Sequence, residues 1–537
     1  MSIFRKQLLF DNQAREKLLK GITVVADAVG STLGPRSRNV AVDYYHDTDL
    51  PPVVLHDGVS VARSINLTDP FEDQGARLVK AAALRTNETA GDGTTTATIL
   101  AHAIVKEALG NIQAGANQML LKEEIDLALK QVLTSLKEIA KPVVSDEEIK
   151  QVGTISAGSE EIGKLVAEAI SKVGKDGVIT VEEGNKVETE VEYKQGMEID
   201  RGYLSPYFVN KQETVEAVIE EPYILLTDKK LNYHYDLVPF LEKFLKAKVG
   251  KNLVIFAGEV VEEALAVLVV NKVRGNLNVV AVQSPAYGDR RIDELEDLAI
   301  LTGGVSILTE SGRSLDSVEI EELGRADKVI ADRDKTIIVN GKGNSGKVKE
   351  RIEDLKGQIK VANTDFDKQI KQERMAKLSG SIAVINVGAA TEVELKEKKE
   401  RVIDAVNATK AATEEGIVAG GEITLLKISN DLQRLLRASK TAPITLGQDI
   451  LFEAMKAPFK RLMENSGLDY AEIREKMSGH DYPEGVDVTD GKVKNLIEAG
   501  IIDPVKVTRS ALENAVSVAS MVITTNCLIV DAPKEES

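Results

Sequence analysis

The residues best suited to chemistry form the hexapeptide Gly91-Asp92-Gly93-Thr94-Thr95-Thr96. Two glycines bracket an acid, and three threonines follow at the start of a predicted helix, whose first backbone N–H groups lack partners within the helix. Such N–H groups and the positive end of the helix dipole bind anions, and a nearby carboxylate can hold Mg²⁺ against phosphate oxygens. The hexapeptide therefore predicts a phosphate site, although a glycine-rich turn with threonine caps would have the same sequence.

Three further acids lie beside glycine, within an apolar run or before proline: Asp57, Asp404 and Asp503. Phosphoryl transfer to water needs one carboxylate that holds the metal and one that orients the attacking water, so the chain has the necessary groups. Each acid alone is also explained as a cap, a turn residue or part of a solvated helix face. Sequence spacing does not show whether the acids meet.

A second phosphate loop competes with the first. Residues 341–348 match the pattern GxxxxGK between a predicted strand and a predicted helix, but Val348 replaces the Ser or Thr that binds Mg²⁺. A turn that leads into a lysine-rich helix explains the same residues. We predict a solvated turn here, with an ATP-dependent metabolic phosphotransferase as the alternative function.

Composition argues against several classes of partner and compartment. The net charge of −17 argues against nucleic acid or an anionic membrane as the main partner. No stretch approaches 18 apolar residues, and the first residues lack the apolar core of a signal peptide. A single cysteine, Cys527, fits a reducing compartment, and the five histidines have no metal-ligand spacing. We expect a cytoplasmic protein.

The elements that must position these acids change character along the chain. Helical spacing of apolar residues covers 15–29 and 97–109, with Gly110 as the expected stop, and short strands are expected at 39–43 and 53–55. From about 196 to 339 strands and helices alternate. Strand-like apolar runs lie at 223–226, 253–256, 279–282 and 305–308, and helices at 260–272 and 292–301.

Beyond residue 340 the chain becomes helical and charged again. Helices are expected from 347 to 378 and from 392 to 415, with a strand at 382–385 between them. The pattern predicts a discontinuous helical domain with a partly parallel α/β unit inserted into it.

Apolar residues in the α/β unit allow two interpretations. Aromatic residues surround a Ser-Pro turn in 202–208, and the 260–272 helix carries Leu265, Leu268, Val269 and Val270. Core packing explains both segments, whereas an exposed patch would mark a protein-binding surface.

Several strings in one order resemble the group I chaperonins, the GroEL/Hsp60 family. They are Thr32-Leu33-Gly34-Pro35 with Arg38-Asn39-Val40, residues 57–63 (DGVSVAR), 91–96 (GDGTTT), 152–157 (VGTISA), 200–208 (DRGYLSPYF), 388–392 (GAATE) and 503–512 (DPVKVTRSAL). The resemblance spans nearly the whole chain. It implies an equatorial ATP-binding domain of residues 1–138 and 415–537, an intermediate hinge domain of 139–195 and 382–414, and an inserted α/β apical domain of 196–381.

The resemblance also assigns site residues for ATP, Mg²⁺ and K⁺. Asp92 would hold Mg²⁺, and Asp57 and Asp404 would orient or activate water. The residues implied to bind the nucleotide are Thr32, Leu33, Gly34, Pro35, Gly91, Asp92, Gly93, Thr94, Thr95, Thr96, Gly420, Gly421 and Asp503, of which Asp503 would receive the ribose hydroxyls. Thr32, His56 and Thr95 are the implied K⁺ neighbours.

The family's activity implies capture of non-native polypeptides and their encapsulation in a ring cavity by ATP hydrolysis. The implied client-binding residues are Tyr203, Tyr207, Phe208, Val238, Leu241, Leu265, Val269 and Val270. The same surface would receive a GroES-type co-chaperonin. Two stacked heptameric rings are expected, with a single ring as the alternative.

Departures from the family strings mark a divergent member. His56 replaces a lysine, Arg36 and Ser37 replace Lys-Gly, Glu422 replaces a third glycine, and the base-contacting Asn-Ala-Ala string is missing near 486–489. A chaperonin-like scaffold that binds clients but barely hydrolyses ATP is therefore a third hypothesis.

Overall fold

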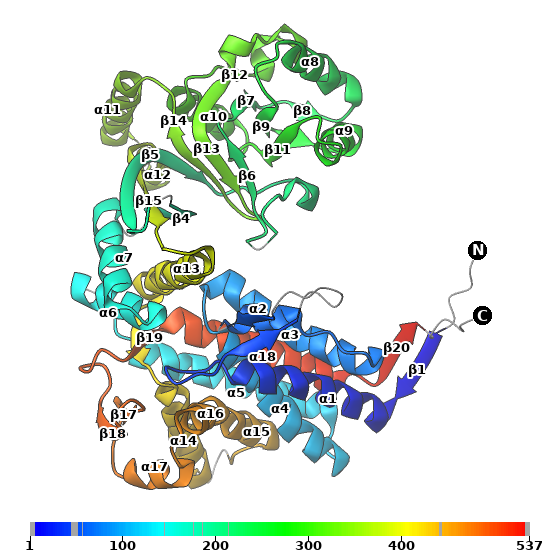
Figure 1. The fold of residues 1–537 in the computed structure, drawn as a ribbon, viewed down its shortest axis with the longest axis vertical. Coiled ribbons are helices and arrows are strands. Elements are labelled where there is room, and N and C mark those ends of the chain that lie inside the picture. The colour runs from blue at the N-terminus through cyan, green and yellow to red at the C-terminus, as the bar shows by residue number, and fades with distance from the viewer. Residues whose placement is uncertain are drawn as a thin grey trace. The chain divides into compact units, whose positions relative to one another are not determined.

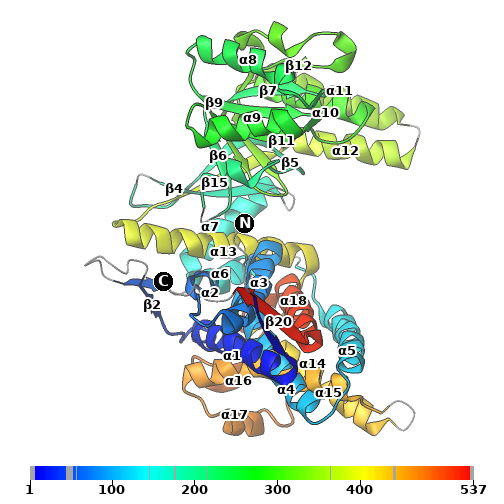
Figure 2. The same cartoon turned by 90° about the vertical axis from the view of Figure 1, so that its right-hand side faces the viewer.

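The computed structural model describes residues 6–43, 52–55, 57–143, 145–174, 177–184, 186–212, 214–362, 364–439 and 443–531. The chain divides into two compact units, one of residues 1–171 with 390–537 and one of residues 172–389 (Figures 1 and 2). The predicted fold class, a discontinuous helical part with an inserted α/β part, is confirmed. The finer division into three domains stays a prediction, since residues 139–171 and 390–414 group with the helical unit.

Long helices build the core of the helical unit. They are α1 (Asp11–Gly30), α3 (Pro70–Ala90), α4 (Thr94–Gln113), α5 (Gln118–Ile139) and α18 (Val505–Thr524). Their apolar faces bury mainly Ala, Val, Ile and Leu, as the scarcity of aromatic residues predicts. Helices α1 and α3 cross at glycine, because a Cβ at Gly21 would lie 1.8 Å from the carbonyl oxygen of Glu72.

Shorter elements complete this unit. They are α2 (Gly58–Ser64), α6 (Asp146–Ala157), α7 (Glu160–Val173), α13 (Glu392–Glu415), α14 (Ile423–Ala438), α15 (Leu446–Ala454), α16 (Ala457–Ser466) and α17 (Tyr470–Lys476). The antiparallel strand pairs are β1 (Lys6–Phe10) with β20 (Cys527–Asp531), β2 (Val40–Val42) with β3 (Val53–Leu55), β16 (Ile417–Ala419) with β19 (Ile502–Pro504), and β17 (Glu484–Asp487) with β18 (Lys492–Asn495).

A ten-stranded mixed sheet organises the α/β unit. Its main path is β11 (Asn278–Gln283), β9 (Asn252–Ala257), β7 (Tyr223–Thr227), β13 (Gly324–Ala331), β14 (Thr336–Gly341), β5 (Glu190–Ile199), β15 (Ser381–Val387) and β4 (Val178–Glu183). Strands β6 (Ala217–Glu220) and β12 (Ser306–Ile307) pair with β13 and β7. Strands β7, β9 and β11 run parallel and are largely buried, which explains their continuous apolar sequences.

Helices of the α/β unit flank this sheet. They are α8 (His234–Lys246), α9 (Glu262–Val273), α10 (Asp289–Thr302), α11 (Ser345–Val361) and α12 (Asp365–Ser379). The segment 347–378, which the sequence predicts to be helical, forms α11 and α12. The side chain of Thr364 begins the second of these helices by accepting from the Asp367 N–H.

The end of α4 differs from the sequence prediction. Gly110 does not stop α4, which continues to Gln113; a Cβ at Gly110 would meet no atom within 4 Å, so no close contact depends on this glycine. Among the described residues, no helix has both the length and the apolar character needed to cross a membrane.

Candidate functional site

The predicted phosphate loop lies between the end of α3 and the start of α4. Gly91 and Gly93 adopt left-handed backbone conformations, with φ of 71° and 86°, which glycine allows without a Cβ penalty. Gly93 is the N-cap of α4 and provides no side-chain cap, and its own N–H donates to Asp92 at 2.6 Å. The loop thus presents the first turn of α4 to an anion, beside a carboxylate.

The loop that follows α1 meets this helix start. The hydroxyl oxygens of Thr32 and Thr95 lie 3.1 Å apart, and Thr32 also donates to the Val29 carbonyl at 2.7 Å. Gly58 lies in the same place, since a Cβ there would be 2.5 Å from the Thr95 hydroxyl oxygen. Three segments far apart in sequence therefore converge, as the predicted nucleotide site requires.

Gly34 and Leu33 are placed by packing. Gly34 has a φ of 89°, and a Cβ there would lie 2.2 Å from the Leu462 side chain. Leu33 packs against the apolar cluster formed by α14, α16 and their neighbours. Pro35 follows within the same turn.

Asp57 is the N-cap of α2. Its carboxylate accepts from the backbone N–H groups of Val59 and Ser60, at 3.1 and 2.8 Å. These bonds hold the carboxylate at the start of the helix, close enough to Asp92 for its charge to raise the pKa of that residue. His56, the neighbouring K⁺ candidate, lies outside the described residues.

Helix α13 brings Asp404 to the same place. Asn407 of this helix packs directly on the phosphate loop, because a Cβ at Gly91 would lie 2.1 Å from the Asn407 Cβ. Asp404 precedes Asn407 by one helical turn and is partly buried. Desolvation, followed by the charges of Asp92 and Asp57, raises its pKa well above the usual range.

Asp503 lies in β19, and Gly420 directly follows its partner strand β16. Val418 is the register partner of Asp503, and a Cβ at Gly420 would lie 3.0 Å from an Asp503 carboxylate oxygen. Desolvation, then the charge of Asp92, raises the pKa of Asp503 to about 7. Gly421, with a φ of 65°, follows directly. Backbone pairing thus brings two predicted segments into contact although Gly420 and Asp503 are 83 residues apart in the sequence.

Sequence reasoning did not assign Glu422 to the site. Its carboxylate accepts a hydrogen bond from the Thr96 hydroxyl, and desolvation followed by the charge of Asp503 raises its pKa to about 8. The residue is the N-cap of α14 and has a left-handed conformation, with a φ of 59°. The signal in the sequence was a bulky acid directly after Gly420-Gly421.

These five acids form a carboxylate cluster: Asp57, Asp92, Asp404, Glu422 and Asp503. The Asp92 side chain stays exposed, yet neighbouring protein atoms displace enough water for desolvation, with the charge of Asp57, to raise its pKa. So much negative charge favours a cation beside any bound phosphate. Within the described residues, no three His, Cys, Asp or Glu side chains converge closely enough to hold a metal ion by themselves.

Backbone N–H groups of the competing 341–348 loop already have hydrogen-bond partners within the chain. The Asn344 side-chain amide oxygen accepts from the Gly346 and Lys347 N–H groups, and the Gly343 N–H donates to the Leu301 carbonyl. Lys347 is exposed. The first turn of α11 is thus capped by its own chain, as expected for a solvated turn.

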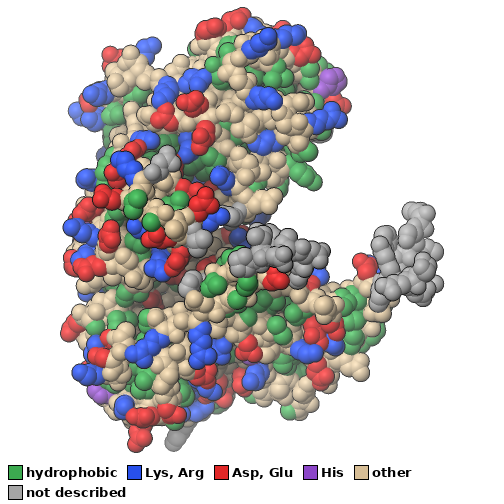
Figure 3. All heavy atoms as spheres, viewed as in Figure 1, with side chains coloured by type: hydrophobic (Ala, Val, Ile, Leu, Met, Phe, Trp, Pro, Cys, Tyr) green, Lys and Arg blue, Asp and Glu red, His purple; other side chains and the backbone are tan. Residues whose placement is uncertain are grey.

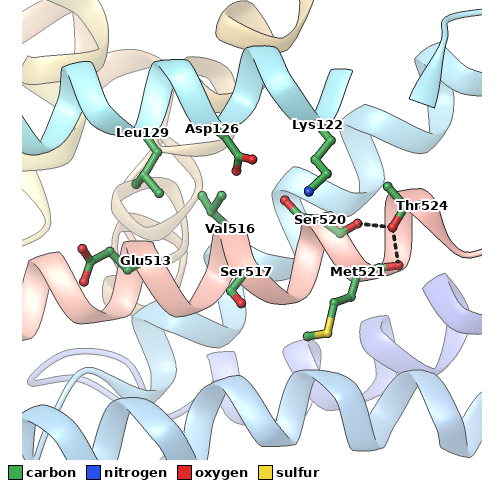
Figure 4. A pocket seen from close by; sticks show the side chains of 9 residues that line it. All are labelled: Lys122, Asp126, Leu129, Glu513, Val516, Ser517, Ser520, Met521 and Thr524. Carbon is green, nitrogen blue, oxygen red and sulfur yellow. Dashed lines mark hydrogen bonds between the residues drawn. The ribbon is translucent and has the colours of Figure 1, made fainter. Parts of the chain in front are cut away.

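A groove of about 410 Å³ lies elsewhere in the helical unit, between α5 and α18 (Figure 4). Lys122, Asp126 and Leu129 line one side, and Ser520 and Met521 contribute to the other. No predicted site residue lines this groove. The carboxylate cluster stays the candidate functional site, because its acids lie beside the anion-binding start of α4, whereas the groove does not.

The predicted client-binding residues differ in exposure. Tyr207 is 69% exposed and Val270 43%, whereas Tyr203, Val238, Leu265 and Val269 are partly buried. Phe208 and Leu241 are 0% and 4% exposed and belong to the core of the α/β unit, so they do not form part of an accessible surface in this structure. Helical and turn spacing alone could not separate the core side of these segments from the outer side.

Two further exposed aromatic residues of the α/β unit lie outside the predicted set. Tyr233 and Tyr235 stack with ring centroids 5.1 Å apart at the start of α8, and His234 between them bonds to Glu263 of α9 at 2.8 Å. Figure 3 shows that hydrophobic side chains on the drawn face form small groups among interspersed charges.

Comparison with known proteins supports the same fold. Residues 25–533 match the model of the TCP-1/cpn60 chaperonin family. The structure resembles two crystal forms of the chaperonin gp146 from bacteriophage EL 2 (Pseudomonas aeruginosa), determined in the presence of ATP-BeFx, with TM-scores of 0.71 and 0.63. Identity is 20% in both, over 98% of this chain and 99% of that chain. The chain therefore belongs to the TCP-1/cpn60 chaperonin family.

Proposed function

We propose that this chaperonin is an ATP-driven folding chaperone that hydrolyses ATP at the carboxylate cluster. The observation that carries the proposal is the convergence of Asp57, Asp92 and Asp404 at the glycine-bracketed start of α4. The structure of gp146 was determined in the presence of ATP-BeFx, which supports a nucleotide as the ligand of this fold.

The chain's own groups suit the binding of a triphosphate. The N–H groups at the start of α4 would bind phosphate oxygens, with Gly91 and Gly93 allowing close approach. Asp92 would hold Mg²⁺ together with those oxygens, and the ion would neutralise charge that develops on the phosphates. The paired hydroxyls of Thr32 and Thr95 are the proposed K⁺ neighbours.

Asp57 and Asp404 would orient the attacking water. Asp57 is fixed by two backbone N–H groups, which suits a positioning role. Desolvation, followed by the charges of Asp92 and Asp57, raises the pKa of Asp404, which suits its carboxylate to accept a proton. Asp503 would receive the ribose hydroxyls, and Gly420 and Gly421 would let the nucleoside approach the backbone.

Client capture would use the exposed apolar residues of the α/β unit. Unfolded polypeptides share exposed hydrophobic surface and little else, so a surface with Tyr207 and Val270 suits them. We propose encapsulation in a ring, with a GroES-type co-chaperonin as the lid and two stacked heptameric rings as the assembly. Light scattering with and without Mg-ATP tests the stoichiometry, since a monomer or dimer in both conditions would leave no enclosed cavity.

Substitution Asp404→Ala tests the hydrolytic site. We expect ATP binding to be retained and the steady-state rate of phosphate release to fall by about 10²–10⁴-fold, because the general base is lost. Glu400→Ala is the matched control, as Glu400 is exposed on the same helix one turn earlier. Its charge has the smallest effect of the three that act on Asp404, so turnover should change far less than in Asp404→Ala. Unchanged turnover in Asp404→Ala would refute the assignment, and a wild-type protein that binds ATP without hydrolysis would favour the scaffold hypothesis.

A further inference from the structure

Glu422 lies at one end of the carboxylate cluster. Asp404 responds to the charges of Asp92 and Asp57, whereas Glu422 responds first to Asp503 and then to Asp92. Asp404 and Asp57 thus interact with each other and with Asp92, whereas Glu422 interacts with Asp503 and Asp92. In the proposed function Asp503 would receive the ribose hydroxyls, so its neighbour Glu422 would lie beside the ribose.

Local contacts hold the Glu422 side chain in this place. The Thr96 hydroxyl, at the start of α4, donates to its carboxylate. Gly420, two residues earlier, lies against the Asp503 carboxylate, since a Cβ there would be 3.0 Å from an Asp503 oxygen. Glu422 thus connects the phosphate loop to the β16–β19 pair that carries Asp503.

The backbone at Glu422 departs from what this residue type prefers. A left-handed φ of 59° disfavours any residue with a Cβ, and glycine would avoid the penalty. An ionisable side chain in a strained and partly desolvated position is unusual for a purely structural residue.

We propose that Glu422, together with Asp503, accepts hydrogen bonds from the two ribose hydroxyls, so that Glu422 makes the site selective for ribonucleotides. The inference rests on the proposed function. A ribose offers two neighbouring O–H donors, and the oxygens of two carboxyl groups accept from them, most strongly when the groups are ionised. Desolvation, followed by the charge of Asp503, raises the pKa of Glu422, and hydrogen bonds from the ribose hydroxyls would stabilise its ionised form.

Calorimetric titration with Mg-ATP, Mg-2′-deoxyATP and Mg-3′-deoxyATP tests the proposal. The wild-type protein should bind each deoxynucleotide about 10-fold more weakly than ATP, as expected for a lost hydrogen bond to a charged acceptor. Glu422→Gly should lose discrimination against one of the two deoxynucleotides. Asp503→Asn should lose discrimination against the other.

Two further variants sharpen the result. Glu422→Gln keeps the length and an acceptor oxygen, so it should retain part of the discrimination that Glu422→Gly loses. Thr96→Val removes the hydroxyl that holds the Glu422 carboxylate and should lower the same discrimination without changing the one that depends on Asp503. Thermal melts would confirm that each variant is folded.

Unchanged ATP-to-deoxyATP ratios in Glu422→Gly would overturn the inference. Tighter binding of all three nucleotides by that variant, with the same ratios, would show instead that Glu422 repels the phosphates. In both cases ATP binding by the wild-type protein would still support the proposed function. A wild-type protein that binds none of the three nucleotides would sink the inference and the proposed function together.

Discussion

Substitution Gly91→Ala should separate the helix that carries Asp404 from the phosphate loop. The φ of 71° at Gly91 costs alanine about 1–2 kcal/mol. The new Cβ would also lie 2.1 Å from the Asn407 Cβ, which is far below van der Waals contact. Relief of this overlap needs a displacement on the order of 1 Å or costs about 1–3 kcal/mol in a packed interface.

Two measurements follow from these magnitudes. The free energy of unfolding should fall by about 2–5 kcal/mol in denaturant titrations, because strain and overlap both act on the folded state. Since Asp404 precedes Asn407 by one turn, a shift of about 1 Å should also lower the single-turnover rate of hydrolysis on the order of 100-fold.

Matched variants distinguish this mechanism from a general effect of added methyl groups. Gly110→Ala lies inside α4 with open space around the new Cβ, so we expect unchanged turnover and a gain of about 0.5–1 kcal/mol in stability. Gly91→Ala combined with Asn407→Gly removes the overlap but keeps the backbone strain, and should recover part of the rate. Wild-type hydrolysis by Gly91→Ala, or no recovery in the double variant, would refute the reasoning.

Three other outcomes can be measured. In the nucleotide-free protein, the raised pKa of Glu422, about 8, means that the folded state binds more protons than the unfolded state, so stability should fall as pH rises from about 5 to 9. The substitution Glu422→Gln should remove on the order of 1–2 kcal/mol of this loss, after allowance for solvent screening. Identical thermal melts of the wild-type and variant proteins at both pH 6 and pH 9 would contradict this. Val270→Glu should weaken capture of a denatured client without changing the melting temperature, whereas Leu241→Glu should lower the melting temperature because it places a charge in the core. Lys347→Ala should leave ATPase activity unchanged, and its loss would restore the 341–348 loop as the nucleotide site.

Much of the fold could be predicted from hydrophobic periodicity. The predicted helix over 392–415 has the bounds of α13, and the four apolar runs of the α/β part all contain strands. Gly110 shows the limit of such reasoning, because a glycine ends a helix only where the following chain offers a better conformation. Thr364 shows the opposite case, in which a cap begins a new helix within a charged segment that looked continuous.

The candidate site was predictable only in part. The glycines of the phosphate loop carried a local signal, because their left-handed conformations and close contacts depend on glycine itself. The convergence of Asp57, Asp404 and Asp503 on Asp92 depends on pairing of distant segments, which local spacing does not encode. The buried positions of Phe208 and Leu241 likewise depend on which side of the α/β core each segment faces.

The pairing of the first and last strands has a consequence for biosynthesis. Lys6 is the register partner of Asp531, so β1 gains its hydrogen-bonded neighbour only after nearly the whole chain has been made. At about 5–20 residues per second, translation leaves the first strand waiting for roughly half a minute to two minutes. Residues 172–389 are contiguous and can fold during that interval, whereas the helical unit must remain incomplete. A chaperonin with this topology is itself a chain that spends its synthesis with apolar helices uncovered.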